Sequence, residues 1–317
     1  MSLLPYLLAY AGIVVFVIAV IARIRMYARM PMHLRWELYP IPHEASRAAH
    51  GGSYLEEVDW WLKPREVSKA AELKAMGTEI IFLEALHKHN RPMWRSSFPF
   101  HFGLYLVIAT TVLMLSGGVL SALSGGFAGS GLGSLWYGAV VVLGAAGMAL
   151  AIYGAFGLLR RRLSSPDLQD FTTSADIFNL AFFVLAFGCA FVTFALFDRD
   201  FALVSGFVRN LVTFRLEPVA SGSAGLMVGI SVCLLSALVA YIPLTHMSHF
   251  VGKYFAYHSV RWGDEPNLKG GPQEAGIMAN LTQKITWAAP HIKSDGQKNW
   301  VEVATMDYKT YGGGEKK

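Results

Sequence analysis

The chain has 317 residues, of which 54% are hydrophobic and only 15% are Asp, Glu, Lys or Arg. An ordinary soluble domain carries roughly a quarter of its residues as charged side chains. Four runs contain no charged residue at all, 1–22, 96–159, 177–197 and 218–252. This pattern excludes a soluble globular enzyme and a disordered chain, and it excludes a nucleic-acid-binding protein despite the pI near 9.1.

Each run is long enough for at least one helix of about 20 residues across a hydrocarbon core about 30 Å thick. Residues 3–22 predict the first span, and the arginines that follow it favour an uncleaved anchor over a signal peptide. The run 96–159 must hold two spans, near 98–120 and 134–158, joined by the Gly/Ser-rich turn 121–134.

The last two runs predict one span each. The fourth span, near 175–197, follows residues suited to N-capping and has Asp176 in its first turn. The fifth covers about 223–250, and Pro243 near its end is expected to kink it. The sequence therefore predicts an all-α integral membrane protein with a five-helix transmembrane bundle.

The distribution of lysine and arginine predicts the orientation of this bundle, because cytoplasmic loops carry an excess of both. With five spans, 24 of these residues fall on one side, in segments 23–95, 160–162 and 251–317, and 3 fall on the other. We therefore expect a multi-pass protein of the cytoplasmic (inner) membrane, with its N-terminus outside and its C-terminus in the cytoplasm.

This topology divides the chain into four parts. They are the first transmembrane helix (1–23), a cytoplasmic loop (24–97), a four-helix transmembrane core (98–258) and a cytoplasmic tail (259–317). The loop contains a helical stretch, 66–89, whose apolar stripe is typical of a helix on the membrane surface or against a partner protein. The tail is polar and rich in Gly and Lys, and is expected to have no core of its own.

The two cysteines, Cys189 and Cys233, both lie in apolar runs, and no CxxC occurs. Iron–sulfur clusters and covalently attached c-type haem need cysteines at defined spacings. The chain is therefore expected to bind neither.

Three of the ten histidines lie at the ends of predicted spans, where an ionisable group is a candidate for function. His101 starts the second span, and His246 and His249 end the fifth. Because these two spans run in opposite directions, His101 and His249 are expected at similar depth, which suits one haem iron held between two helices. Two imidazole ligands make a six-coordinate electron-transfer haem. A histidine at a membrane boundary can equally be an interfacial residue, and periodicity does not choose between His246 and His249.

Several short strings resemble a known family. SSFPFHFG (96–103), the segment with Arg160–Arg162, and PLTHMSH (243–249) resemble the cytochrome b family of the respiratory nitrate reductase gamma subunit. MHLRWELYPIPHE (32–44) and HFVGKYFAYHSVRW (249–262) look like its relatives in transmembrane redox complexes of sulfate-reducing organisms. The resemblance covers about residues 1–262 and implies the same N-outside, five-helix topology.

Carried over residue by residue, the resemblance implies that His101 and His249 are the axial ligands of a haem near the cytoplasm. A set of basic residues also qualifies, by the side of the membrane on which they lie, as neighbours of a haem propionate or a quinone, and each of them is equally typical of a surface or anchoring residue. These neighbours are His246, Arg160, Arg161, Lys253 and His33. Where the family holds a second, outer haem, this chain has Thr111 and Ser231, so one haem b on the cytoplasmic side is expected.

The implied function is a haem b membrane subunit that passes electrons between menaquinone and a cytoplasmic, heterodisulfide-reductase-like iron–sulfur subunit. The resemblance also allows a periplasmic multihaem cytochrome c and further membrane subunits as partners. Such a chain is an electron-transfer subunit of a quinone-linked oxidoreductase complex, not a free-standing enzyme. Two other interpretations remain, a haem-free membrane anchor for a redox complex and a transporter. Against a transporter, no span carries an acidic residue deep in the bilayer.

Overall fold

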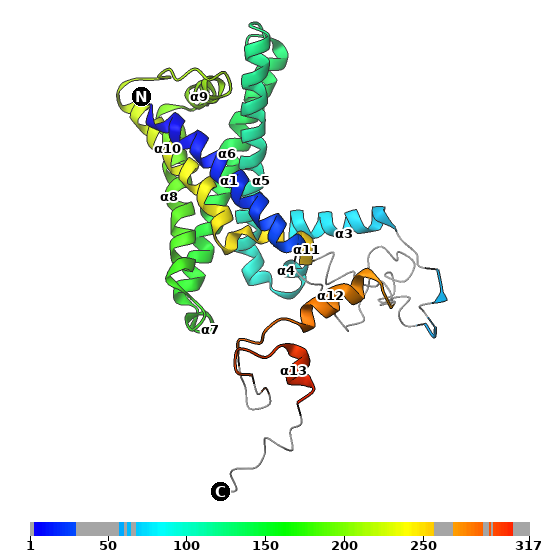
Figure 1. Ribbon diagram of the computed structural model, residues 1–317. Helices are drawn as coiled ribbons and strands as arrows, with labels where there is room; N and C mark the ends of the chain where they lie inside the picture. The colour runs from blue at the N-terminus through cyan, green and yellow to red at the C-terminus, as the bar shows by residue number, and fades with distance from the viewer. Residues whose placement is uncertain are drawn as a thin grey trace. The chain divides into compact units, whose positions relative to one another are not determined.

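The computed structural model describes residues 3–29, 57–59, 62–64, 68–256, 269–287, 292 and 294–306. These parts of the chain form helices and short 3₁₀ turns, without a β-sheet among them (Figure 1). The helices are, in chain order, α1 (Leu4–Ala28), α3 (Lys69–Phe82), α4 (Glu84–His89), α5 (Arg91–Leu123), α6 (Gly131–Ser164), α7 (Pro166–Gln169), α8 (Ser174–Phe197), α9 (Ala202–Val212), α10 (Gly222–Tyr241), α11 (His249–Ala256), α12 (Pro272–Leu281) and α13 (Trp300–Ala304).

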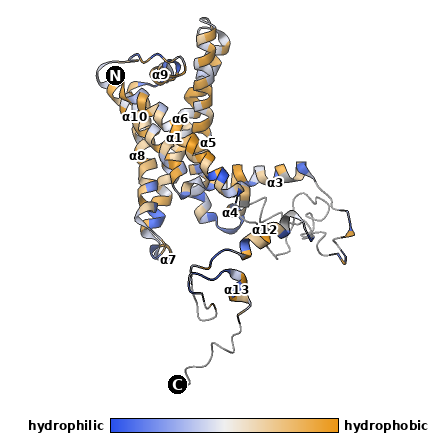
Figure 2. Cartoon of the chain, viewed as in Figure 1, coloured by the Kyte–Doolittle hydropathy of each residue, from blue (hydrophilic) through white to orange (hydrophobic). Residues whose placement is uncertain are grey.

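Five helices of the described part are long and apolar enough to cross a membrane. They are α1, α5, α6, α8, and α10 with the turn that follows it. Figure 2 shows hydrophobic residues along these helices, as expected for helices that face lipid on one side and other spans on the other. The five predicted spans are confirmed, and the protein is a multi-pass membrane protein.

The two central spans are longer than predicted. α5 begins at Arg91, ahead of the predicted 98, because the Asn90 side chain caps it by accepting a hydrogen bond from the backbone N–H of Met93 (3.2 Å). The 33 residues of α5 and the 34 of α6 each extend about 50 Å, against about 30 Å of hydrocarbon. One consequence is a correction, since Arg160–Arg162, which lie beyond the predicted end of the third span at 158, belong to the end of α6.

The fifth span ends earlier than predicted, so the single kinked helix expected over 223–250 is wrong. α10 stops at Tyr241, and two 3₁₀ turns follow, η3 (Ile242–Leu244) and η4 (His246–Ser248). Pro243 lacks the N–H that a continuing helix needs, and its ring clashes with the preceding turn. α11 then begins as a separate helix at His249.

A short helix that the sequence did not predict, α9, lies between α8 and α10. Asp198 caps it, because its carboxylate accepts two backbone N–H groups of the first turn, at 2.8 and 3.0 Å. This carboxyl is 4% exposed, and its burial raises its pKa. The hydroxyl of Tyr10 donates to the carbonyl of Leu211 (2.6 Å), so α9 also holds the N-terminal half of α1 in place.

The helix predicted over 66–89 is two helices in the structure. α3 and α4 meet at Leu83, whose left-handed backbone (φ 52°) breaks the helix. Two side chains of α5 fix the end of α3, because the Tyr105 hydroxyl and the Trp94 indole N–H donate to carbonyls of its last turn, at 2.9 and 2.8 Å. Exposed apolar residues on α3, such as Leu73, agree with a helix at the membrane surface.

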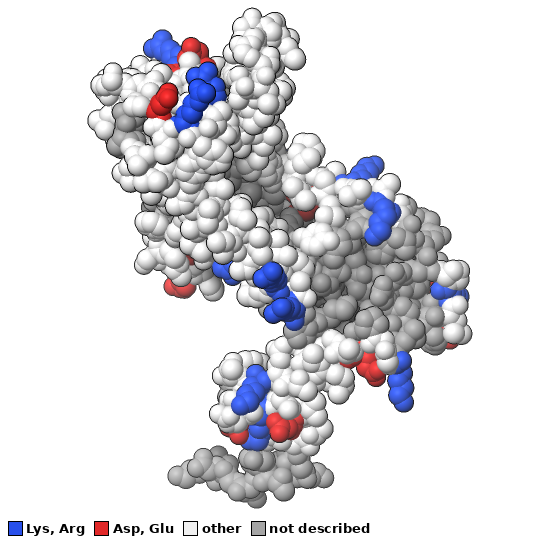
Figure 3. Space-filling view, turned by 45° about the horizontal axis from the view of Figure 1, so that its top comes forward, with Lys and Arg blue, Asp and Glu red and all other residues white. Residues whose placement is uncertain are grey.

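The chain divides into two compact units, residues 1–20 with 73–248, and residues 21–72 with 249–317. The first unit contains α5, α6, α8, α9 and α10 and the beginning of α1. On the face drawn in Figure 3, charged side chains gather near the ends of these spans and leave a broad uncharged surface between them. This distribution is the one that a bilayer imposes.

The described part of the tail contains local structure and two buried apolar residues. Ile285 is 1% exposed and Val303 is 3% exposed. The rings of Trp287 and Trp300 are 6.2 Å apart in an edge-on arrangement. Two short helices, α12 and α13, supply this local structure.

Candidate functional site

His101 lies in α5, ten positions after the start of the helix at Arg91, and its side chain is half-buried. Its Nδ1 is 2.7 Å from the backbone carbonyl oxygen of Ser97, one turn earlier. A carbonyl only accepts, so Nδ1 carries the proton and donates it to this bond. The hydrogen bond therefore determines the tautomer and orients the ring.

The chemistry of His101 follows from that tautomer. With the proton on Nδ1, the lone pair of the neutral imidazole is on Nε2. Metal-binding histidines usually donate their other ring N–H to a carbonyl or carboxylate in this way, which fixes the ring and raises the basicity of the ligating nitrogen. His101 can therefore bind iron through Nε2, as an axial haem ligand does.

Glycines bring α5 and α6 into backbone contact beside His101. A Cβ atom added to Gly103 would lie 2.5 Å from the backbone nitrogen of Ala151, and one added to Gly147 would lie 3.0 Å from the carbonyl oxygen of Gly103. Gly154 meets the backbone of Phe100 in the same manner. Small residues at such positions let membrane helices approach closely, so the position of His101 is determined by α6 as well as by α5.

The other two histidines do not share a helix, contrary to expectation. His246 lies in the turn η4, with 63% of its side chain exposed, and His249 is the first residue of α11. An angular comparison around one helix therefore does not apply to them. His249 follows directly on Ser248, the last residue of the first compact unit.

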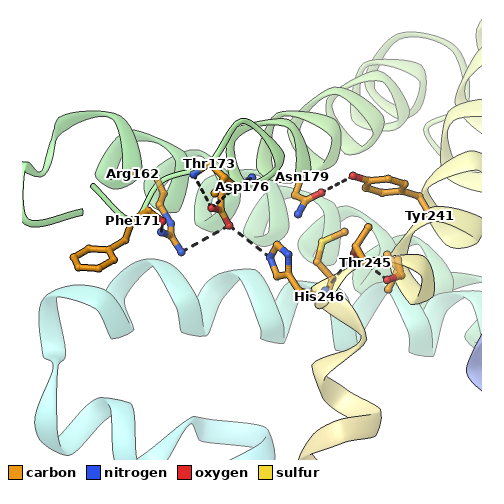
Figure 4. Close-up of polar contacts among 10 residues, drawn as sticks. Arg162, Phe171, Thr173, Asp176, Asn179, Tyr241, Thr245 and His246 are labelled. Atoms are coloured by element: carbon orange, nitrogen blue, oxygen red, sulfur yellow. Dashed lines mark hydrogen bonds and ion pairs between the residues drawn. The ribbon is translucent and has the colours of Figure 1, made fainter. Parts of the chain in front are cut away.

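Several polar groups lie around the carboxylate of Asp176 at the start of α8, as Figure 4 shows. Asp176 forms a capping box with Thr173, whose backbone N–H donates to its carboxylate (2.9 Å). The Nε2 of His246 is 3.6 Å from its Oδ1, and Arg162 is 4.0 Å from the same oxygen. The N-cap predicted for the fourth span is confirmed, and the structure adds a basic residue from α6 and a histidine from η4.

The remaining predicted neighbours have different outcomes. Arg160 is exposed and Arg161 is half-buried, and it is Arg162, their neighbour, that reaches Asp176. Lys253 belongs to α11, but its side chain is outside the described residues. His33 is also outside the described residues.

Thr111 and Ser231, the two positions at which the sequence analysis expected no outer haem ligand, have other contacts here. Thr111 is exposed and donates its hydroxyl to the carbonyl of Val107 (2.9 Å). Ser231 is buried and shares a hydrogen bond of 2.8 Å with the hydroxyl of Thr193. Cys189, a free thiol, lies 3.5 Å from the same serine oxygen.

The structure also brings together two residues that the sequence analysis missed. Asn179 is 3% exposed, and its amide oxygen accepts a hydrogen bond from the hydroxyl of Tyr241 (2.8 Å). One is in α8 and the other is the last residue of α10 (Figure 4). The signal that could have found Asn179 is its position as a polar residue inside the charge-free run 177–197.

Comparison with known protein families identifies relatives of this chain. The nitrate reductase gamma subunit family model matches residues 85–262, which is more than half of the chain. This chain belongs to the nitrate reductase gamma subunit family. A search among curated proteins finds no match to it. The family predicted from the local strings is confirmed, while the closer likeness to the sulfate-reducer branch stays a prediction.

Members of this family are haem-binding cytochrome b subunits in the membrane part of respiratory redox complexes. The matched region contains His101, His246 and His249. Among the described residues no group of three or more His, Cys, Asp or Glu side chains could hold a metal ion. A haem iron needs only two axial ligands from the protein, and the tautomer of His101 fits that role.

The Asp176 cluster gives a first testable prediction. Asp176→Ala should lower the free energy of unfolding by about 1 kcal/mol, because the N-cap bonds of α8 are lost. Asp176→Asn should lose less, since an amide still caps the helix while the charge facing Arg162 and His246 is removed. Thermal unfolding of the purified protein in detergent measures both changes. Equal losses for the two variants would contradict the capping role.

Proposed function

We propose that this protein is a membrane electron-transfer subunit that binds one haem b through His101 and His249, on the cytoplasmic side of the membrane. It exchanges electrons between menaquinone and a cytoplasmic iron–sulfur subunit of a respiratory complex. The N-terminus is outside and the C-terminus is in the cytoplasm, as the Lys and Arg distribution predicts.

One observation carries the proposal, namely the hydrogen bond from Nδ1 of His101 to the Ser97 carbonyl, in a chain that belongs to a haem b family. In a neutral imidazole this bond places the lone pair on Nε2, the nitrogen that would bind the iron. Nearby apolar residues supply the dry surroundings that such a ligand requires, since Phe100 and Phe183 are 8% and 3% exposed. Their rings meet edge-on at 4.9 Å.

The contacts of Thr111 and Ser231 support a single haem. A threonine or serine hydroxyl is not an axial ligand of a b-type haem, which takes histidine. Thr111 faces outward, and Ser231 is engaged with Thr193 between α8 and α10. Aromatic and aliphatic side chains occupy the core nearby, among them Met114, which is 7% exposed.

Bound haem supplies a reversible one-electron carrier, and the residues of the chain supply its environment. The Ser97 carbonyl orients His101, the glycine contacts between α5 and α6 keep the ring in position, and buried aromatic residues exclude water. Arg160–Arg162 at the end of α6 provide positive charge on the proposed cytoplasmic side, where haem carboxylates are stabilised.

Two surfaces support the proposed partners. An iron–sulfur subunit would bind on the proposed cytoplasmic side, because a redox partner must approach the haem from that side. The exposed apolar residues of α3 offer it a contact surface there. On the outer side the hairpin between α5 and α6 carries exposed leucines, and Leu123 is 81% exposed. A periplasmic multihaem cytochrome c or a further membrane subunit would meet the chain there.

The test is a haem count on the purified chain and on the complex from native membranes. A dithionite-reduced minus oxidised spectrum, calibrated as the pyridine haemochrome, should give one haem b per chain. Menadiol should reduce the same haem without dithionite. A chain that binds no haem while still holding its partner in the membrane would support the haem-free anchor instead.

A further inference from the structure

The side-chain NH₂ group of Asn179 donates no hydrogen bond to any of the described residues. Its amide oxygen is occupied by Tyr241, and its Nδ2 is buried without an acceptor among the described residues. Figure 4 shows this nitrogen turned away from the tyrosine. A buried amide donor without a partner destabilises the protein, because it has lost its hydrogen bond to water. A group with a carbonyl oxygen would satisfy it.

The surroundings of this amide are aromatic and reach the lipid. The ring of Tyr241 meets those of Phe178 and Phe182 edge-on, at 5.6 and 5.8 Å. Phe178 is 55% exposed on a membrane-spanning helix, so this cluster borders the bilayer. A flat, lipid-soluble ring packs favourably against such edges.

Aromatic contacts also connect this place with His101. Phe183 lies one turn after Asn179 on α8, and its ring meets that of Phe100 at 4.9 Å. The ring of Phe100 in turn meets the imidazole of His101 at 5.4 Å. The amide is therefore separated from the proposed haem ligand by two buried rings.

We propose that Asn179 and Tyr241 form a binding site for the headgroup of a quinone, in which Nδ2 of Asn179 donates a hydrogen bond to one ring oxygen, the carbonyl of the quinone or the hydroxyl oxygen of the quinol. Tyr241 orients the amide through its hydroxyl, and Phe178 and Phe182 contact the ring from the lipid side. This inference rests on the proposed function, because it gives that function the location of its quinone.

Charge argues for a neutral ligand here over a haem carboxylate. Two basic residues, Arg162 and His246, face Asp176, which is three residues before Asn179 on α8. A buried carboxylate needs a cation or several donors. A single neutral amide is a matched donor for a neutral carbonyl, and a carboxylate would also meet the charge of Asp176.

The experiment uses native membranes that contain the complete complex, with menadiol as the probe. The rate of haem b reduction is followed at the α-band, without oxygen, over a range of menadiol concentrations. Asn179→Leu should raise the menadiol concentration for half-maximal rate by about tenfold, the effect of one lost hydrogen bond of about 1.4 kcal/mol. Tyr241→Phe should also raise the menadiol concentration for half-maximal rate. This variant replaces Asn179→Leu in the test if the latter does not accumulate in the membrane.

Thr193→Val is the matched control, since Thr193 is a buried polar residue of the same helix whose hydroxyl is used by Ser231. It should leave the menadiol dependence unchanged. An unchanged dependence in both Asn179→Leu and Tyr241→Phe overturns the site, while the proposed function stands as long as menadiol reduces the wild-type haem. Loss of dithionite-reducible haem in Asn179→Leu also overturns it, because the amide would then hold the haem. Wild-type haem that menadiol does not reduce contradicts the proposed function itself.

Discussion

His101→Ala and His249→Ala are each expected to remove the haem b absorbance almost completely, while the protein still accumulates in the membrane. Each change deletes one of the two proposed axial nitrogens, and a haem held by a single histidine loses its six-coordinate, electron-transferring state. The measurement is the dithionite-reduced minus oxidised spectrum of membranes, normalised to the amount of chain by immunoblot.

His246→Ala is the matched control. It changes a histidine three residues before His249, and its side chain is 63% exposed beside Asp176. Its spectrum should keep the full amplitude. If His246→Ala loses the haem and His249→Ala keeps it, the ligand on this segment is His246, and the assignment of His249 implied by the family resemblance is wrong.

Gly103→Ala should destabilise the protein strongly for a change that adds a single methyl group. The added carbon would lie 2.5 Å from the nitrogen of Ala151 and 2.7 Å from the carbonyl oxygen of Gly147, both backbone atoms that no rotamer change can move. α5 and α6 would have to separate next to His101. Overpacking of this kind costs about 1–3 kcal/mol or more, and we expect a lower unfolding temperature together with weaker haem retention.

Gly138→Ala is the control for this change. Gly138 lies on α6, and an added Cβ meets nothing within 4 Å. Alanine is also the better helix former, so this variant should unfold at the same temperature as the wild type or a higher one. The comparison is made by thermal unfolding in detergent and by the haem remaining after heating. Similar unfolding temperatures for the two variants would mean that α5 and α6 separate more easily than their contacts indicate.

The spans could be predicted from sequence because hydrophobic length is a local property. Every charge-free run became one or two membrane-spanning helices, and Thr173 with Asp176 marked the start of α8 correctly. The ends were less accurate where apolar sequence continues beyond the helix. Hydropathy does not change at Tyr241, although Pro243 and two 3₁₀ turns end the helix there.

The candidate site was predictable only in part, because some of its contacts are local and others join distant segments of the chain. His101 could be selected because a histidine is rare in an apolar run, and the resemblance pointed to its role. Its bond to Ser97 is a local contact between residues one turn apart. The pairing of Asn179 with Tyr241 depends on how α8 and α10 are rotated against each other, and the contact of Asp176 with Arg162 depends on the end of α6. Such contacts between distant segments have no signal in a single sequence.

The end of α10 at Tyr241 bears on the order in which the protein matures. Its 20 residues extend about 30 Å, so the last span is complete before His249 has been added to the growing chain. With His249 as the proposed second haem ligand, we expect haem insertion to be a late step, which follows the integration of all five spans and needs the segment beyond them. Chains truncated after Ser248 should enter the membrane normally and stay colourless, which separates membrane insertion from cofactor loading during biogenesis.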